Sequence, residues 1–157
     1  MTAVRGASRI PRSMAADSME PADSPGFLLW RATLKWQRFM AATLRPFGLT
    51  HVQFVLLASL WWVTARAGER PSQTRLAEFA GTEPMMTSQV LRTLESKGLV
   101  TRASHATDAR ARQLAVTPAG TNLAKQTLAA VRAADDGFFA EAGGRKSLIE
   151  FLRTLAP

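Results

Sequence analysis

The sequence contains no cysteine and only two histidines among its 157 residues. Without thiols, the chain has no disulfides, no thiolate metal ligands and no thiol redox sensor, which is consistent with a reducing compartment. The histidines, His51 and His105, lie far apart in the sequence and are too few to found a metal site. We therefore expect neither a bound metal nor a cofactor.

Motifs of the common enzyme classes are also missing. The chain has no serine in a nucleophile elbow and no glycine-rich phosphate loop. Adjacent acids occur at Asp135 and Asp136, beside Gly137, where they resemble a helix end rather than an acid–base pair. The sequence predicts a protein that is not an enzyme.

Long apolar runs are absent. The longest, residues 54–63, is interrupted by Ser59 and is about half as long as a membrane-spanning helix requires. Arg5, Arg9 and Arg12 are not followed by the apolar segment of a secretory signal. We expect no membrane partner and a cytoplasmic location.

Acidic residues are few relative to basic ones. The chain has 12 Asp and Glu against 20 Lys and Arg, a formal net charge of +8. Such an excess favours a polyanionic partner such as nucleic acid, although a merely basic globular protein has the same charge balance. The apolar fraction of 46% is typical of a folded domain.

The chain opens with a tail and a long helix. Residues 1–22 are rich in Ala, Ser, Arg and Pro without an apolar period, which predicts a flexible tail. Ser24 and Pro25 form a capping signal for a helix that ends near Pro46 and Gly48. Its wide apolar stripe indicates packing against more than one surface, with a second subunit as one candidate.

Three further helices are predicted between Thr50 and residue 97. Thr50 caps a largely apolar helix, and residues 74–80 and 85–97 predict two helices separated by Gly81. The inner side of the second of these two helices carries residues spaced three and four apart, namely Thr87, Val90, Leu91 and Leu94.

The remainder predicts strands and two more helices. Residues 99–102 and 113–116 read as strands around a polar, arginine-rich hairpin tip, and helices are expected from Thr117 to about residue 136 and over 146–155. Helix, short turn, helix and hairpin is the order of a winged helix-turn-helix. The predicted fold is mainly α with a small β-hairpin wing.

Five segments resemble the MarR family of transcriptional regulators. They follow in the family's order: 48–56 (GLTHVQFVL), 76–80 (LAEFA), 94–100 (LESKGLV), 108–110 (DAR) and 114–120 (LAVTPAG). The resemblance covers residues 25–155 and implies a homodimeric DNA-binding regulator, most often a repressor. Behind the tail over 1–22, which the composition predicts, it implies an N-terminal dimerisation helix over 23–48, a winged helix-turn-helix domain over 49–117 and C-terminal dimerisation helices over 118–157.

The recognition helix is expected to present its outer side to a major groove. Gln pairs with an adenine edge and Arg with a guanine edge, so we expect Gln89 and Ser88 to contact bases and Arg92 a base or a phosphate. Many relatives carry Arg where this chain has Gln89, which bears on base preference rather than on docking. The alternative is a solvated helix face. Further candidates near this helix are Arg75, Met86 and Thr93.

The wing supplies the other candidate DNA contacts. The resemblance implies that Arg110 enters the minor groove, with Asp108 orienting it or forming an ordinary turn. Arg102 and Arg112 are expected to face phosphates, which position a protein without reading sequence. Paired subunits predict a pseudo-palindromic operator.

The resemblance also implies a small aromatic or phenolic effector, bound between the dimerisation helices and the winged module. Aromatic walls suit such a ligand, but for any single one of these residues plain core packing is the better explanation. The candidate residues are Trp30, Met40, His51, Phe54, Trp61 and Trp62. The competing functions are a non-specific, architectural DNA-binding protein and a winged module used for protein contacts.

Overall fold

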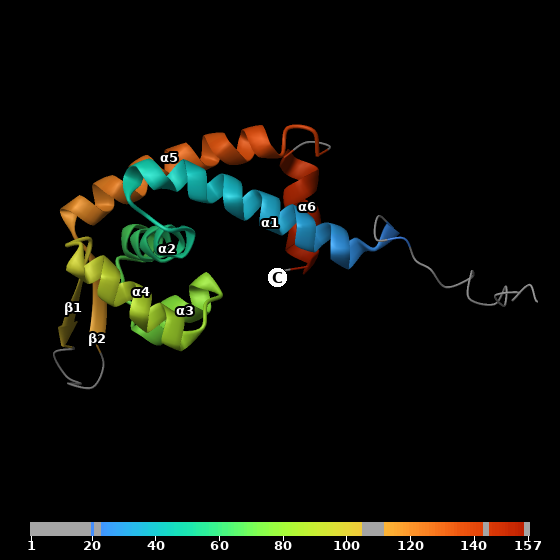
Figure 1. Ribbon diagram of the computed structural model, residues 1–157. Coiled ribbons are helices and arrows are strands. Elements are labelled where there is room, and N and C mark those ends of the chain that lie inside the picture. Colours follow the sequence, from blue (N-terminus) through green and yellow to red (C-terminus); the bar gives the residue numbers. More distant parts are fainter. Residues whose placement is uncertain (1–19, 21–22, 105–111, 143–144, 156–157) are drawn as a thin grey trace, which may run out of the picture. The chain divides into compact units, whose positions relative to one another are not determined.

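The computed structural model describes residues 20, 23–104, 112–142 and 145–155. Its elements are, in order, α1 (Pro25–Leu44), the 3-10 helix η3 (Arg45–Phe47), α2 (His51–Ala67), α3 (Gln73–Ala80), α4 (Pro84–Ser96), β1 (Val100–Ser104), β2 (Arg112–Val116), α5 (Pro118–Phe138) and α6 (Arg145–Leu155) (Figure 1). The chain forms two units, residues 1–35 and 36–157. The predicted mainly α fold with one β-hairpin is confirmed.

The described part of the first unit is the beginning of α1. The backbone N–H of Phe27 donates to the Ser24 hydroxyl at 3.4 Å, which is the predicted cap. The rings of Phe27 and Trp30 lie 6.1 Å apart, and the Arg31 guanidinium lies 5.8 Å from the centre of the Phe27 ring. Large apolar side chains on this stretch are nevertheless exposed: Phe27, Leu28, Leu29 and Trp30.

In the second unit, α2 is the central helix because it packs against α3, α4, α5 and β2. Figure 1 shows α3 and α4 on one side of α2 and α5 on the other. The buried side chains of α2 form one core with leucines from its neighbours: Phe54, Leu56, Leu57, Leu60, Leu76, Leu91, Leu94 and Leu114. No single helix in the described ranges is long and apolar enough to cross a membrane, although α1–η3 and α2 meet that test as a bent pair.

Local signals set the helix starts. Thr50 accepts a hydrogen bond from the Gln53 N–H at 3.3 Å, and Gln53 Oε1 accepts one from the Thr50 N–H at 3.2 Å. This reciprocal pair is a capping box. The hydroxyls of Ser72 and Thr117 cap α3 and α5 in the same way, each accepting from the N–H three residues later.

The hairpin is fixed to the first turn of α5. In β1 and β2, Val100 pairs with Val116 and the register continues to Ser104 and Arg112, so the strands extend further toward the tip than expected. At the base, the Thr117 hydroxyl donates to the Gly98 and Leu99 carbonyls at 2.8 and 3.1 Å.

Gly120 allows a close approach at this junction. A Cβ atom there would lie 2.0 Å from the carbonyl oxygen of Leu99, which is backbone and cannot rotate away. Glycine is therefore required where α5 meets the start of the wing.

Candidate nucleic-acid interface

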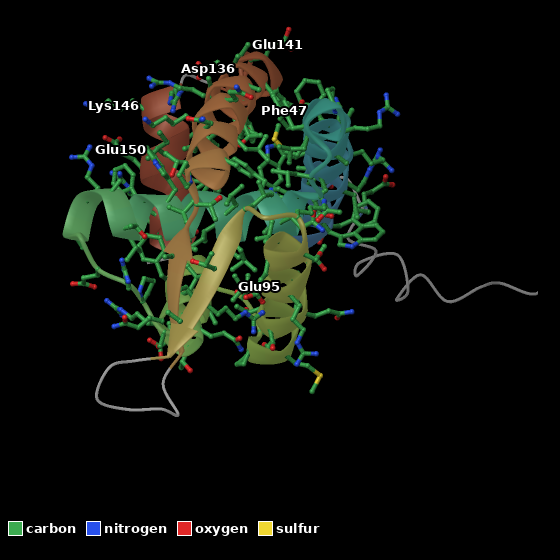
Figure 2. The ribbon with its side chains drawn as sticks, turned by 90° about the vertical axis from the view of Figure 1, so that its left-hand side faces the viewer. Phe47, Glu95, Asp136, Glu141, Lys146 and Glu150 are labelled. Atoms are coloured by element: carbon green, nitrogen blue, oxygen red, sulfur yellow. The ribbon has the colours of Figure 1, made fainter. Side chains whose placement is uncertain are left out.

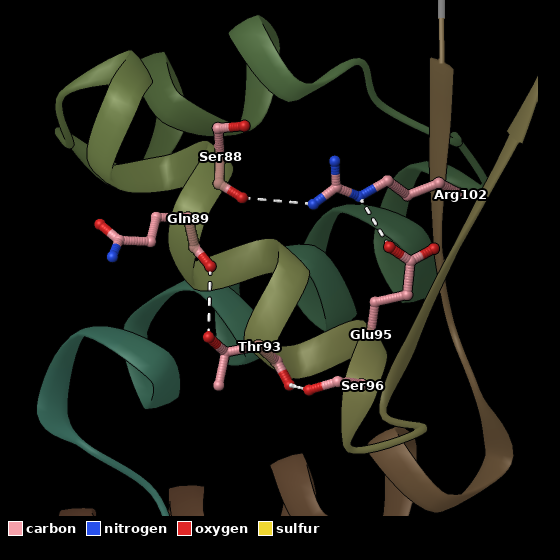
Figure 3. Close-up of polar contacts among 6 residues, drawn as sticks. All are labelled: Ser88, Gln89, Thr93, Glu95, Ser96 and Arg102. Carbon is pink, nitrogen blue, oxygen red and sulfur yellow. Dashed lines mark hydrogen bonds and ion pairs between the residues drawn. The ribbon is translucent and has the colours of Figure 1, made fainter.

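The helix α4 has one buried side and one outward side. Thr87, Leu91 and Leu94 are fully buried, which confirms the predicted inner side. Gln89 and Arg92 are exposed on the outward side, and Figure 3 shows the Gln89 amide pointing away from Arg102 and the strands. Such a helix can place polar side chains against the edges of bases.

The other predicted contacts on α4 differ in their solvent exposure. Met86 is 39% exposed, whereas Ser88 and Thr93 are half-buried. The Thr93 hydroxyl donates to the Gln89 carbonyl at 3.3 Å. Met85, which was not among the predicted contacts, is 85% exposed in the first turn of this helix.

A tight turn holds α4 at its angle to α3. Gly81 has a φ of 63°, and its N–H donates to the Glu78 carbonyl at 3.2 Å. The Thr82 and Thr87 hydroxyls lie 2.8 Å apart, and Thr87 also donates to the Glu83 carbonyl at 2.8 Å. The buried hydroxyl of Thr87 is thus satisfied within the turn, which fixes the start of α4.

Lys97 fixes the other end of α4. Its ammonium donates to the Gly48 carbonyl at 2.7 Å and to Gln53 Oε1 at 3.0 Å. Two of the segments that carry the family resemblance, 48–56 and 94–100, therefore meet through side-chain hydrogen bonds. From the sequence we expected only that the helix ends near residue 97.

Arg102 was expected to face a phosphate, and the structure places its side chain against α4. Its side chain is only 9% exposed, and its Nε lies 3.3 Å from Glu95 Oε2. Its Nη2 donates to the carbonyl oxygen of Ser88 at 3.3 Å (Figure 3). The guanidinium is turned toward α4 because a carboxylate and a carbonyl there compensate a cation that leaves water. Figure 2 shows Glu95 between α4 and the wing strands.

The remaining candidate DNA contacts are only partly described. Arg75 is exposed on α3, with its guanidinium 3.8 Å from the Glu78 carboxylate. Arg112 is the first residue of β2. Asp108 and Arg110 lie outside the described residues.

Most of the effector candidates of the second unit are core residues. Met40 and Phe54 are buried, and Trp61 packs against the core. Trp62 is 46% exposed, with the Arg66 guanidinium 4.7 Å from its ring centre. Trp30, in the first unit, is also exposed.

His51 belongs to a small polar cluster that the sequence did not indicate. Its ring packs edge-on against Trp36 at 4.8 Å, and the Trp36 indole N–H donates to Asp135 Oδ1 at 2.9 Å. Burial lowers the pKa of His51 below 6.5, and the nearby Asp135 carboxylate opposes that shift by a smaller amount. Trp36 and Asp135 are 99 residues apart, so no local pattern could have joined them.

Comparisons with known proteins agree with this architecture. Residues 49–111 match the model of the MarR family. Over 135 residues the chain is 43% identical to the HTH-type transcriptional regulator YdcH of Bacillus subtilis (strain 168), which covers 86% of this chain and 91% of YdcH. It is 36% identical over 116 residues to the HTH-type transcriptional repressor Rv2887 of Mycobacterium tuberculosis (strain ATCC 25618 / H37Rv), covering 72% of this chain and 78% of the repressor.

Solved structures of the repressor CouR share the fold. CouR bound to a 23-mer DNA duplex matches with a TM-score of 0.77 at 26% identity, covering 88% of this chain and 96% of CouR. CouR from Rhodococcus jostii RHA1 bound to p-coumaroyl-CoA matches with a TM-score of 0.73 at 26% identity, covering 88% and 92%. The winged helix-turn-helix fold, the outward side of α4 and these relatives lead to one conclusion: the chain belongs to the MarR family of DNA-binding transcriptional regulators.

Proposed function

We propose that this chain is a repressor that binds a pseudo-palindromic operator as a homodimer, with one α4 in each major-groove half-site. The observation that carries the proposal is the two-sided character of α4. Thr87, Leu91 and Leu94 anchor it in the core, while Gln89 and Arg92 remain free of the core on the outward side. Helices of this kind read base edges in winged helix-turn-helix proteins.

The proposed roles follow from side-chain chemistry. Gln89 and Ser88 read bases, and Arg92 contacts a base or a phosphate, because Gln and Arg match the edges of adenine and guanine. Arg75, Met86 and Thr93 border this contact. In the wing, Arg110 enters the minor groove, Asp108 orients it, and Arg112 contacts phosphate.

Exposed apolar side chains support a homodimer. In α6 no described residue is buried, although Phe151, Leu152 and Leu155 are large and apolar. The beginning of α1 is similarly rich in exposed aromatic and aliphatic side chains. Exposed large apolar side chains are common at protein interfaces, and each end of the chain supplies several of them.

A small aromatic ligand is proposed as the effector. The support is the number of aromatic side chains on α1 and α2, together with a structure of the 26% identical CouR bound to p-coumaroyl-CoA. The candidate side chains are Trp30, Met40, His51, Phe54, Trp61 and Trp62. A set of aromatic and phenolic acids should include at least one that raises the melting temperature and lowers DNA affinity.

The test is selection of bound duplexes from a random pool at near-physiological ionic strength. The proposal predicts enrichment of a two-fold symmetric sequence whose half-site centres lie about one helical turn apart. Sedimentation of the protein alone should show a dimer. Uniform binding to all duplexes would instead indicate the non-specific, architectural alternative, and a monomer would contradict the paired half-sites.

A further inference from the structure

We propose that Arg102 is a positioning residue that locks the wing to the recognition helix, rather than a contact to DNA phosphate. Arg102, the Glu95 carboxylate and the Ser88 carbonyl are called the wing clamp. The inference rests on the proposed function, since it concerns how α4 and the wing present themselves to a duplex. It assigns Arg102 a role different from the one expected for a wing arginine.

The wing clamp joins one point on the hairpin to two points on α4. Arg102 lies in β1, where it pairs with Leu114 of β2. On the helix its guanidinium contacts Ser88 and Glu95, which are seven residues apart, or about two turns. The segment between those two contacts includes Gln89 and Arg92, the proposed base-reading residues. The clamp therefore controls the angle between these side chains and the wing.

Because the guanidinium is nearly buried, Arg102 depends on these particular partners. The Arg102 side chain is 9% exposed, whereas the Glu95 side chain is 43% exposed. A cation that is nearly removed from water must keep its compensating partners, because an unpaired buried charge is strongly unfavourable. The planar guanidinium pairs with the carboxylate through Nε, without a hydrogen bond, while its Nη2 donates to the carbonyl. A lysine ammonium does not reproduce this arrangement.

The same geometry argues against a phosphate contact. To meet a phosphate, Arg102 would have to leave Glu95 and Ser88. If it stayed in place, the Glu95 carboxylate beside it would repel the phosphate. Because the ion pair is already neutral as a whole, Arg102 should release no DNA counterion on binding. A phosphate contact, by contrast, contributes about 0.9 to the slope of log affinity against log salt.

The experiment compares Arg102→Gln with Arg132→Gln, which removes the same charge from an exposed position on α5. Affinities for the selected operator and for random duplex are measured across a range of salt concentrations. We expect Arg102→Gln to lower the ratio of operator to random affinity by about tenfold, as for other contacting residues, with an unchanged salt slope. Arg132→Gln should leave the ratio unchanged.

Two further variants separate positioning from general stability. Glu95→Gln removes the carboxylate that compensates the nearly buried guanidinium and should therefore lower the ratio as well. The exchanged pair Glu95→Arg/Arg102→Glu should recover part of the lost specificity. In the free protein, amide hydrogen exchange in α4 and β1 should accelerate in Arg102→Gln. If Arg102→Gln fails to fold, Glu95→Gln and Arg102→Lys provide the same comparison.

The outcomes distinguish this inference from the proposed function. If Arg102→Gln lowered operator and random affinity equally and reduced the salt slope by about 0.9, Arg102 would be a phosphate contact and the wing clamp would be refuted. Unchanged specificity together with unchanged hydrogen exchange would refute it as well. A wild-type protein that selects no sequence would refute the proposed function itself.

Discussion

The DNA-binding core of this chain buries its large apolar side chains, whereas the helical ends expose several of theirs. In α3 and α4, Leu76, Leu91 and Leu94 are completely buried within one chain. Trp30 near the beginning of α1 and Phe151 in α6 are each 58% exposed. The core is therefore complete in a single chain, whereas the ends expose surface that a second subunit would cover. The contrast teaches that the proposed base-reading surface and the proposed dimer surface can be altered separately.

The largest expected effect comes from overfilling the core at the base of the wing. Gly120→Ala places a methyl group 2.0 Å from the Leu99 carbonyl oxygen, and the cost should reach about 3 kcal/mol of unfolding free energy or prevent folding. Gly137→Ala, near the end of α5, meets nothing within 4 Å and should stabilise by about 0.5–1 kcal/mol. Urea unfolding measures both. Equal effects at the two glycines would contradict the close approach.

A charge on the apolar side of α6 should separate the subunits. Phe151→Glu would raise the dimer dissociation constant at least about 30-fold, as for an interface anchor worth about 2 kcal/mol. Thr154→Glu changes the charge of the same helix equally and should have little effect. Sedimentation equilibrium gives both constants. A Phe151→Glu dimer as tight as the wild type would show that α6 is not part of the pairing surface.

A smaller loss is expected at the C-terminal end of α4. Lys97→Met removes the hydrogen bonds to the Gly48 carbonyl and to Gln53 and should cost about 0.5–1.5 kcal/mol. Lys125→Met, at an exposed position on α5, is the matched control and should be close to neutral. Thermal unfolding of the two variants tests this. A Lys97→Met protein as stable as the control would mean that these bonds add nothing beyond hydration.

The smallest effect is a pH dependence through His51. Burial lowers its pKa in the folded state below 6.5, so between the folded pKa and 6.5 the unfolded chain binds more protons. Stability from this residue is thus fully present above pH 6.5 and is lost as the pH falls toward the folded pKa. The free energy of unfolding, measured from pH 7.5 downward, should fall less steeply in His51→Gln. Parallel pH profiles would show that His51 keeps its ordinary pKa.

Local patterns were sufficient to predict most of the fold. The caps at Thr50 and Thr117, and the inner side of α4, depend on residues three or four positions apart, so the sequence displays them directly. The structure contains every predicted α-helix, with ends shifted by a few residues, whereas the 3-10 helix η3 was not predicted. Both strands extend further toward the hairpin tip than predicted.

The contacts that fix the site could not be predicted in this way. Lys97 meets Gly48 across 49 positions, and Trp36 meets Asp135 across 99. For Arg102, the arginine-rich wing suggested an outward side chain, but the nearby Glu95 carboxylate and Ser88 carbonyl draw it inward. Such partners depend on the packed arrangement of helices, which periodicity does not specify.

The central claim is that the outward side of α4 reads bases, and repeating the duplex selection with Gln89→Ala tests it most directly. Gln126→Ala, at an exposed position on α5, serves as the control and should select the wild-type sequence. We predict that Gln89→Ala loses discrimination at one position in each half-site, worth about 1–3 kcal/mol per base contact, while its affinity for random duplex is unchanged. Selection of the wild-type sequence with undiminished preference at every position would contradict the account.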